Sequence, residues 1–130
     1  MATSFIHWQK SKRILALEAS AIDRYLLHTI FGRINIAADI TSNLPDGLQA
    51  AGQHAYHAVF LDWLLADSQV SPLQTICTCK QLAQVPVVVM SCDVYPASRQ
   101  AALQAGAALY IHKPLTTRLM IDILLTILPL

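Results

Sequence analysis

The chain carries the run VPVVVM at residues 85–90, its strongest succession of apolar and β-branched residues. A run that is apolar without alternation indicates a strand buried on both faces, as in a parallel sheet. Weaker runs of the same kind lie at residues 14–17, 34–38, 58–61 and 107–111. Together the five runs predict a parallel sheet of five strands.

Helical patterns separate these runs. We expect helices at residues 21–31, 46–52, 71–83, 96–105 and 114–128. Ser71-Pro72 offers a capping side chain and a proline for a first turn, and Gly106 suits the left-handed end of the preceding helix. Strands that alternate with helices, joined by right-handed crossovers, predict an α/β fold: a doubly wound sheet in a three-layer sandwich.

Length and composition fit one domain of ordinary size. We place it at residues 12–130 of the 130-residue chain, behind an N-terminal extension at residues 1–11. Charged residues make up 13%, against about 25% in typical domains, which favours a sheet buried on both faces or a large partner surface. The net charge of +1 gives no reason to expect nucleic-acid binding. With neither a secretory signal nor an apolar stretch of the roughly 20 residues that a membrane span needs, we expect a cytoplasmic protein.

Polar side chains follow four of the five runs, at the strand ends where doubly wound sheets bind their ligands. In chain order these residues are Glu18, Asp62, Ser91 and Lys113. Each has a plainer interpretation: Asp62 and Ser91 as helix caps, Glu18 as an acid favoured at a helix start, and Lys113 as a surface lysine. Because the carboxyl ends of parallel strands meet at one edge, the four residues together favour a shared site.

Taken in order, these residues resemble the response-regulator receiver domain. Members of that family have acids after the first strand, an aspartate closing the third, Ser or Thr after the fourth and Lys-Pro after the fifth. The run AGAALYIHKP at residues 105–114 carries the resemblance most specifically, and the similarity covers about residues 12–128. It implies the flavodoxin-like fold, a (βα)5 five-stranded sheet, and a role in two-component signalling.

The resemblance implies a role for each strand-end residue. Receivers take a phosphoryl group from a histidine kinase or a phosphotransfer protein onto an aspartate, which here would be Asp62. Lys113 would supply a positive charge to that group, and Ser91 a hydroxyl that binds it. Tyr110 matches the switch aromatic whose inward or outward rotamer reports the state of the domain. The chain would then be no enzyme, apart from catalysing phosphoryl transfer to its own aspartate.

The resemblance also implies a Mg²⁺ site, with ligands from Asp62, Glu18 and the backbone carbonyl of Leu64. Ala19 stands where the family has its directly ligating acid, and a methyl group cannot bind a metal ion. The segment after Asp62, residues 63–67, also lacks the family's proline and Asp-Gly. Mg²⁺ usually takes only one or two carboxylates, so we expect a site that is weakened and not abolished.

Three functions remain open at this stage. The first is a phosphorelay receiver that accepts a phosphoryl group on Asp62 and signals through protein–protein contacts, unless the chain is part of a longer protein with its own output domain. The second is a non-phosphorylated pseudo-receiver that serves as an interaction or dimerisation module. The third, a small flavodoxin-like cofactor binder, is disfavoured because residues 18–21 hold no glycine and carry an acid that would repel a phosphate.

The last expected helix offers a candidate partner surface. At 100° per residue, Leu119, Ile123 and Ile127 line the side that faces the sheet. Ile121 and Leu125 then point away from it, with few charges near them. An outward apolar patch usually marks a contact, so the pattern predicts a homodimer, or binding of another partner, through this helix.

Overall fold

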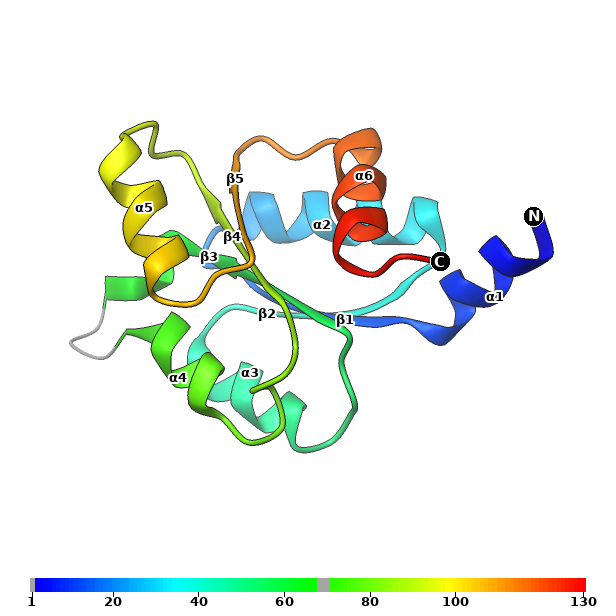
Figure 1. Cartoon of the computed structure of the whole chain (residues 1–130), viewed down its shortest axis with the longest axis horizontal. Coiled ribbons are helices and arrows are strands. Elements are labelled where there is room, and N and C mark those ends of the chain that lie inside the picture. Colours follow the sequence, from blue (N-terminus) through cyan, green and yellow to red (C-terminus); the bar gives the residue numbers. More distant parts are fainter. Residues whose placement is uncertain (1, 68–70) are drawn as a thin grey trace.

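The computed structural model describes residues 2–67 and 71–130 and contains one five-stranded sheet (Figure 1). Its strands are β1 (Arg13–Leu17), β2 (Ala37–Thr41), β3 (Ala58–Asp62), β4 (Val87–Ser91) and β5 (Leu109–His112). They pair in the order β2-β1-β3-β4-β5, and every pairing is parallel. The predicted doubly wound, flavodoxin-like sheet is confirmed.

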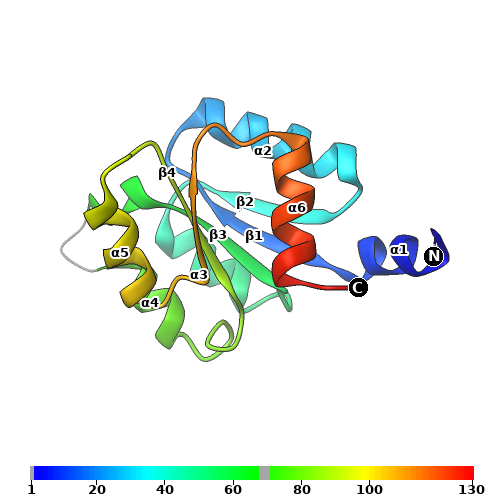
Figure 2. The ribbon, with the colours of Figure 1, turned by 45° about the horizontal axis from the view of Figure 1, so that its top comes forward.

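Helices cover both faces of the sheet. They are α1 (Ala2–Ser11), α2 (Ala21–Ile34), α3 (Leu44–Ala51), the 3₁₀ helix η1 (Trp63–Asp67), α4 (Pro72–Thr78), α5 (Pro96–Gln104) and α6 (Thr117–Ile127). Helices α2 and α6 lie on one face, while α3, α4 and α5 lie on the other (Figures 1 and 2). None of the helices in the described residues is long and apolar enough to cross a membrane.

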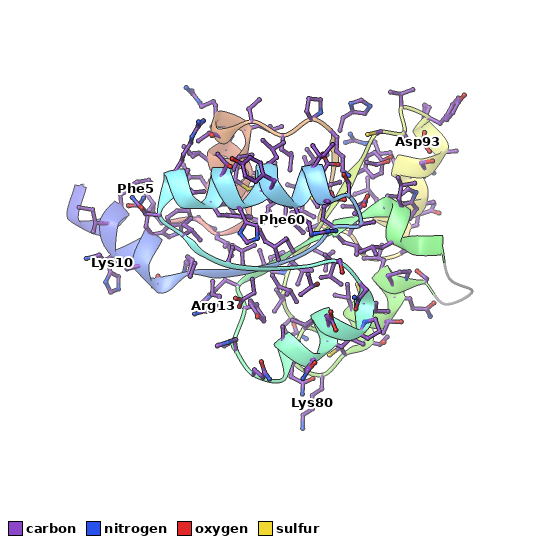
Figure 3. The ribbon with its side chains drawn as sticks, turned by 180° about the vertical axis from the view of Figure 1, so that it is seen from behind. Phe5, Lys10, Arg13, Phe60, Lys80 and Asp93 are labelled. Carbon is purple, nitrogen blue, oxygen red and sulfur yellow. The ribbon has the colours of Figure 1, made fainter. Side chains whose placement is uncertain are left out.

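The strands are buried on both faces, as their unbroken apolar runs predict. Alternate residues of one strand enter different cores: Phe60 packs with α2 and α6, while Val59 and Leu61 pack with the helices of the opposite face. Figure 3 shows Phe60 between α2 and the sheet. Its ring meets Phe31 of α2 edge to face, with 6.0 Å between ring centroids. Two packed cores on one sheet give the strand ends a rigid support.

Several element boundaries differ from the sequence prediction, mostly by one to three residues. Ile34 ends α2 and does not begin β2, because Asn35 takes a left-handed conformation (φ 57°) that closes the helix. Helix α4 stops at Thr78, since Cys79 is extended. Helix α6 begins at Thr117, three residues after Pro114, because the Thr116 side chain caps it by accepting a hydrogen bond from Leu119 N at 3.1 Å.

Residues 1–11, which we expected to form an N-terminal extension, contribute a helix to the fold. Trp8 of α1 is buried, and its indole N–H donates to the Leu128 carbonyl at 2.6 Å. The Gln9 amide donates to the Ile34 carbonyl at 2.7 Å. Helix α1 is therefore anchored to the ends of both α2 and α6, and Trp8 joins the core beneath them.

Helix α6 buries more of its surface than the sequence pattern indicates. Met120, Ile123 and Leu124 are buried. Ile121 and Leu125 are half-buried and pack against the same core, so the prediction that they point away from it is wrong. Helix α6 packs against α2, and its flanks as well as its central stripe contribute side chains to the core on that face of the sheet.

Changing Ile121 and Leu125 together to lysine should therefore lower the free energy of unfolding by about 2–3 kcal/mol, since two half-buried apolar side chains lose their packing. Urea denaturation of the native and doubly substituted chains measures this loss, and sedimentation reports the association state of each. A variant of native stability that dissociates a native dimer would restore the original interpretation of these residues as a partner surface.

Candidate functional site

The four strand-end residues lie at one edge of the sheet, as predicted. Asp62 is the last residue of β3, and Ser91 is the last of β4. Glu18 follows β1 and is held there by a hydrogen bond from its N–H to the Thr41 carbonyl, at 2.9 Å. Lys113 follows β5 and donates its N–H to the Ser91 carbonyl at 2.8 Å. The sheet ladder thus continues one residue past two strands and fixes where these side chains begin.

Asp62 is a buried carboxylate with a donor on each oxygen. Its Oδ2 accepts from Ala19 N at 3.1 Å, and its Oδ1 accepts from Leu64 N at 3.2 Å and from Lys113 Nζ at 3.3 Å. Burial opposes ionisation, but hydrogen bonding with Glu18 and with the two N–H groups, together with the Lys113 charge, outweighs it, so the pKa of Asp62 lies below its ordinary value. Asp62 is therefore ionised at neutral pH, as a nucleophile must be.

Glu18 ionises less readily than Asp62. Its Oε2 accepts from Ser20 N at 3.0 Å, whereas Oε1 lies 2.7 Å from Lys113 Nζ without meeting a donor of the described residues at hydrogen-bond geometry. Burial, and then the neighbouring Asp62, raise the pKa of Glu18 to about 7, although Lys113 and the Ser20 N–H act in the opposite direction. Glu18 thus changes its charge near neutral pH.

Lys113 forms ion pairs with three carboxylates. Its Nζ lies 2.7 Å from Glu18 Oε1, 3.0 Å from Asp23 Oδ2 and 3.3 Å from Asp62 Oδ1. Burial alone would lower the pKa of Lys113, but the hydrogen bonds and charges of these acids raise it above its ordinary value. The ammonium is therefore charged at any physiological pH. Asp23, in the first turn of α2, was not among the predicted site residues.

Ser91 and Tyr110 form a second group beside the first. The Ser91 hydroxyl accepts from Asp93 N at 2.9 Å, and the buried Tyr110 donates its hydroxyl to the Asp93 carbonyl at 3.0 Å. Trp63 meets the Tyr110 ring edge to face, with centroids 6.5 Å apart. The Asp93 carboxylate accepts from the Ser98 hydroxyl of α5, and Figure 3 shows Asp93 beside that helix. Asp93, also missed by the sequence prediction, links the end of β4 to α5.

The residues present fit a divalent cation only in part. Two buried carboxylates, Asp62 and Glu18, lie 3.3 Å and 2.7 Å from Lys113 Nζ, and Glu18 Oε1 is the one buried side-chain oxygen without a hydrogen bond among the described residues. Ala19 adds no oxygen from its side chain. No three Asp, Glu, His or Cys side chains of the described residues are placed to hold a metal ion together. Asp62, Glu18 and the Leu64 carbonyl could hold Mg²⁺ with waters completing its shell.

Replacing Ala19 with aspartate should strengthen Mg²⁺ binding about tenfold or more, because it adds a charged oxygen ligand at the edge of the site. Ala19 N already donates to Asp62, so the new side chain begins within reach of the same pocket. Titration with Mg²⁺, followed by the fluorescence of Trp63, measures the affinity. Equal Mg²⁺ affinity in the native and Ala19→Asp chains would mean that Glu18 compensates fully for the acid that is missing at position 19.

Comparisons with known proteins agree with this geometry. The family model described as the response regulator receiver domain matches residues 14–125. No curated protein sequence matches the chain. Among solved structures, a response regulator protein from Burkholderia multivorans is 26% identical, with a TM-score of 0.70 over 88% of this chain and 93% of that one.

Two more distant structures share the fold. The receiver domain of a sensor histidine kinase from Pseudomonas aeruginosa PAO1, which has a magnesium ion in its active site cleft, is 18% identical, with a TM-score of 0.75 over 88% of this chain and 95% of that one. The receiver domain of the response regulator Ssk1 from Saccharomyces cerevisiae, solved with the histidine phosphotransfer protein Ypd1, is 16% identical, with a TM-score of 0.76 over 89% of this chain and 88% of that one. With its fold, its strand-end residues and the family match over residues 14–125 in agreement, the chain belongs to the response regulator receiver domains of two-component signalling.

Proposed function

We propose that this receiver domain accepts a phosphoryl group on Asp62 from a phosphohistidine and signals through protein–protein contacts. The observation that carries the proposal is the contact between a buried, ionised Asp62 and Lys113, 3.3 Å apart at the carboxyl ends of β3 and β5. Such a pair combines a nucleophile with a positive charge for the group it receives.

The transfer itself uses few groups. A carboxylate oxygen of Asp62 forms the new O–P bond, the P–N bond of the phosphohistidine breaks, and the leaving imidazole keeps the electron pair and takes a proton from water. The N–H groups of Ala19 and Leu64 hold the carboxylate in place, and Lys113 offsets the charge that the phosphoryl oxygens bring. Mg²⁺, when bound by Asp62 and Glu18, would neutralise further charge on the transferring group.

Ser91 and Asp93 offer a route from the site to the surface. A phosphoryl group on Asp62 would attract the Ser91 hydroxyl, which at present accepts from Asp93 N. Asp93 in turn bonds Tyr110 through its carbonyl and α5 through its carboxylate. Movement of Ser91 would therefore loosen the segment that holds Tyr110 inward and fixes the start of α5.

The exposed face at the start of α2 is the proposed docking surface for the phosphohistidine donor. Ile22 and Tyr25 are 81% and 76% exposed, and Leu64 of η1 is also exposed. Leu64 lies two residues after Asp62, and Ile22 and Tyr25 lie in the first turns of α2, which follows Glu18 and Ala19, so a protein bound there would lie beside the site. The yeast receiver of similar fold was solved in complex with a histidine phosphotransfer protein, which supports a donor of that class.

The second candidate is a pseudo-receiver that binds partners without phosphorylation, and Ala19 is the observation that favours it. Incubation of the chain with a small phosphodonor and Mg²⁺, followed by intact-mass measurement, separates the two. Phosphorylation adds one phosphoryl mass that requires the folded chain and disappears on mild hydrolysis of the acyl phosphate. A chain that gains no mass from the small donor or from a phosphotransfer protein would be a pseudo-receiver.

A further inference from the structure

Lys113 has as many acidic neighbours as it has N–H groups. An ammonium carries three hydrogens, and its three acidic neighbours are Glu18, Asp23 and Asp62. The four residues would carry a formal charge of −2 with every acid ionised. A phosphoryl group on Asp62 would bring three further acceptor oxygens, which compete with Glu18 and Asp23 for Lys113.

Asp23 differs from the other two acids in its access to water. Its side chain is 34% exposed, whereas those of Glu18 and Asp62 are each 1% exposed. Water can replace Lys113 beside Asp23 at little cost, but a buried carboxylate that loses its cation pays a large penalty. The contact with Asp23 is therefore the one that can open and close.

The position of Asp23 is also fixed by the start of α2. Ser20 caps this helix, and its hydroxyl accepts from Asp23 N at 3.3 Å. Arg24 donates to the carbonyls of Glu18 and Ala19, both at 2.9 Å, and so ties the same turn to the loop that holds the acids. Asp23, Glu18 and Lys113 line one pocket, and Glu18 Oε1 is buried 2.7 Å from Lys113 Nζ without a hydrogen bond of suitable geometry among the described residues.

We propose that Asp23 is a positioning residue. From the first turn of α2 it supplies the negative charge that the site lacks at Ala19. It holds Lys113 toward the pocket mouth, so that Glu18 and Asp62 need not bind the lysine alone and can share an added cation. It releases Lys113 when a phosphoryl group arrives. Only the release of Lys113 rests on the proposed phosphorylation of Asp62; the effect of Asp23 on cation binding does not.

The two halves predict opposite effects of one substitution. Asp23→Asn removes a negative charge and leaves Lys113 to the two buried acids, which lowers the affinity for a divalent cation. The same change frees a Lys113 N–H and weakens repulsion of an anionic phosphodonor, which raises the rate of phosphoryl uptake at saturating Mg²⁺. A variant that merely disturbed the fold would lower both quantities.

The experiment uses Mg²⁺ alone in calorimetric titrations, and a small phosphodonor at saturating Mg²⁺ in a separate rate measurement. Asp46→Asn is the matched control, because Asp46 occupies the same position in the first turn of α3, with Asn43 capping its N–H as Ser20 caps Asp23. We expect Asp23→Asn to weaken Mg²⁺ binding and to accelerate uptake, each by about three- to tenfold, the range for one partly screened charge. The control should change neither.

A rescue completes the test. Adding Ala19→Asp to Asp23→Asn should restore Mg²⁺ affinity to at least the native value, because it returns an acid to the pocket. Asp23→Asn that matches the control in Mg²⁺ affinity, or a native chain without measurable Mg²⁺ binding, would overturn the inference. So would a variant that binds Mg²⁺ less tightly and is also phosphorylated more slowly at saturating Mg²⁺. A native chain that binds Mg²⁺ as expected but never gains a phosphoryl group would instead count against the proposed function.

Discussion

Asp62→Asn should lose phosphoryl uptake completely, with no adduct after prolonged treatment with a small phosphodonor. The amide nitrogen and oxygen are poor nucleophiles, whereas the native carboxylate is kept ionised by its hydrogen-bond partners and by the Lys113 charge. The substitution keeps the size of the side chain and an acceptor for one of the two N–H groups that Asp62 now binds. Lys113 keeps Glu18 and Asp23, so we expect a folded chain.

Intact-mass measurement compares the variant with the native chain, and Asp93→Asn is the control. Asp93 is another aspartate at a strand end, two residues beyond β4, but its carboxylate is bound by Tyr95 N and the Ser98 hydroxyl and does not contact Lys113. Asp93→Asn should still gain one phosphoryl mass. An adduct of native size on Asp62→Asn would remove Asp62 from its proposed role.

The sequence predicts the sheet and its site edge well, for a simple physical reason. A strand buried on both faces must be apolar throughout, so each strand leaves a visible run, and the polar residue that follows marks the strand end. Asp62, Glu18, Ser91 and Lys113 were found in this way. Once the strands are parallel, the meeting of their carboxyl ends follows without further information.

Asp23 could not be found by the same reasoning. It lies on a helix, where an acid in the first turn is favoured by the helix dipole and needs no other explanation. Its contact with Lys113 joins residues 90 positions apart and depends on how closely α2 approaches the end of β5. A local sequence pattern cannot predict a contact between residues so far apart in the chain.

The misplaced boundaries have a related cause. Residues 34–38 are apolar enough for a strand, but Ile34 is needed as the last buried residue of α2, and the left-handed Asn35 then closes the helix. Trp8 in the first helix gave no signal, because its partner, the Leu128 carbonyl, is 120 residues away. In both cases tertiary packing decides between local structures that the sequence allows equally.

Lys113→Met should lower the free energy of unfolding by about 3–5 kcal/mol at pH 8, because it leaves two buried carboxylates without their cation. The loss should shrink as the pH falls toward 5. Glu18 already has a pKa of about 7 in the folded chain, against 4.5 for the ordinary side chain, so the folded state takes up its proton first and gains stability as the pH falls through that interval. Without Lys113 the pKa of Glu18 rises further and that of Asp62 rises from its lowered value, so protonation relieves more of the penalty.

The other two groups do not obscure this effect. In the native chain, the raised pKa of Lys113 adds stability that is lost only above its ordinary value of 10.5, and the lowered pKa of Asp62 adds stability that is lost only below 3.8. Urea denaturation between pH 5 and pH 8 measures the dependence, and Lys113→Met combined with Glu18→Gln is the control. The double variant has one buried charge fewer, so it should recover much of the stability at pH 8 and lose most of the pH dependence. A Lys113→Met chain that is equally destabilised at pH 5 and pH 8 would show that packing of the lysine chain, and not its charge, stabilises this edge of the sheet.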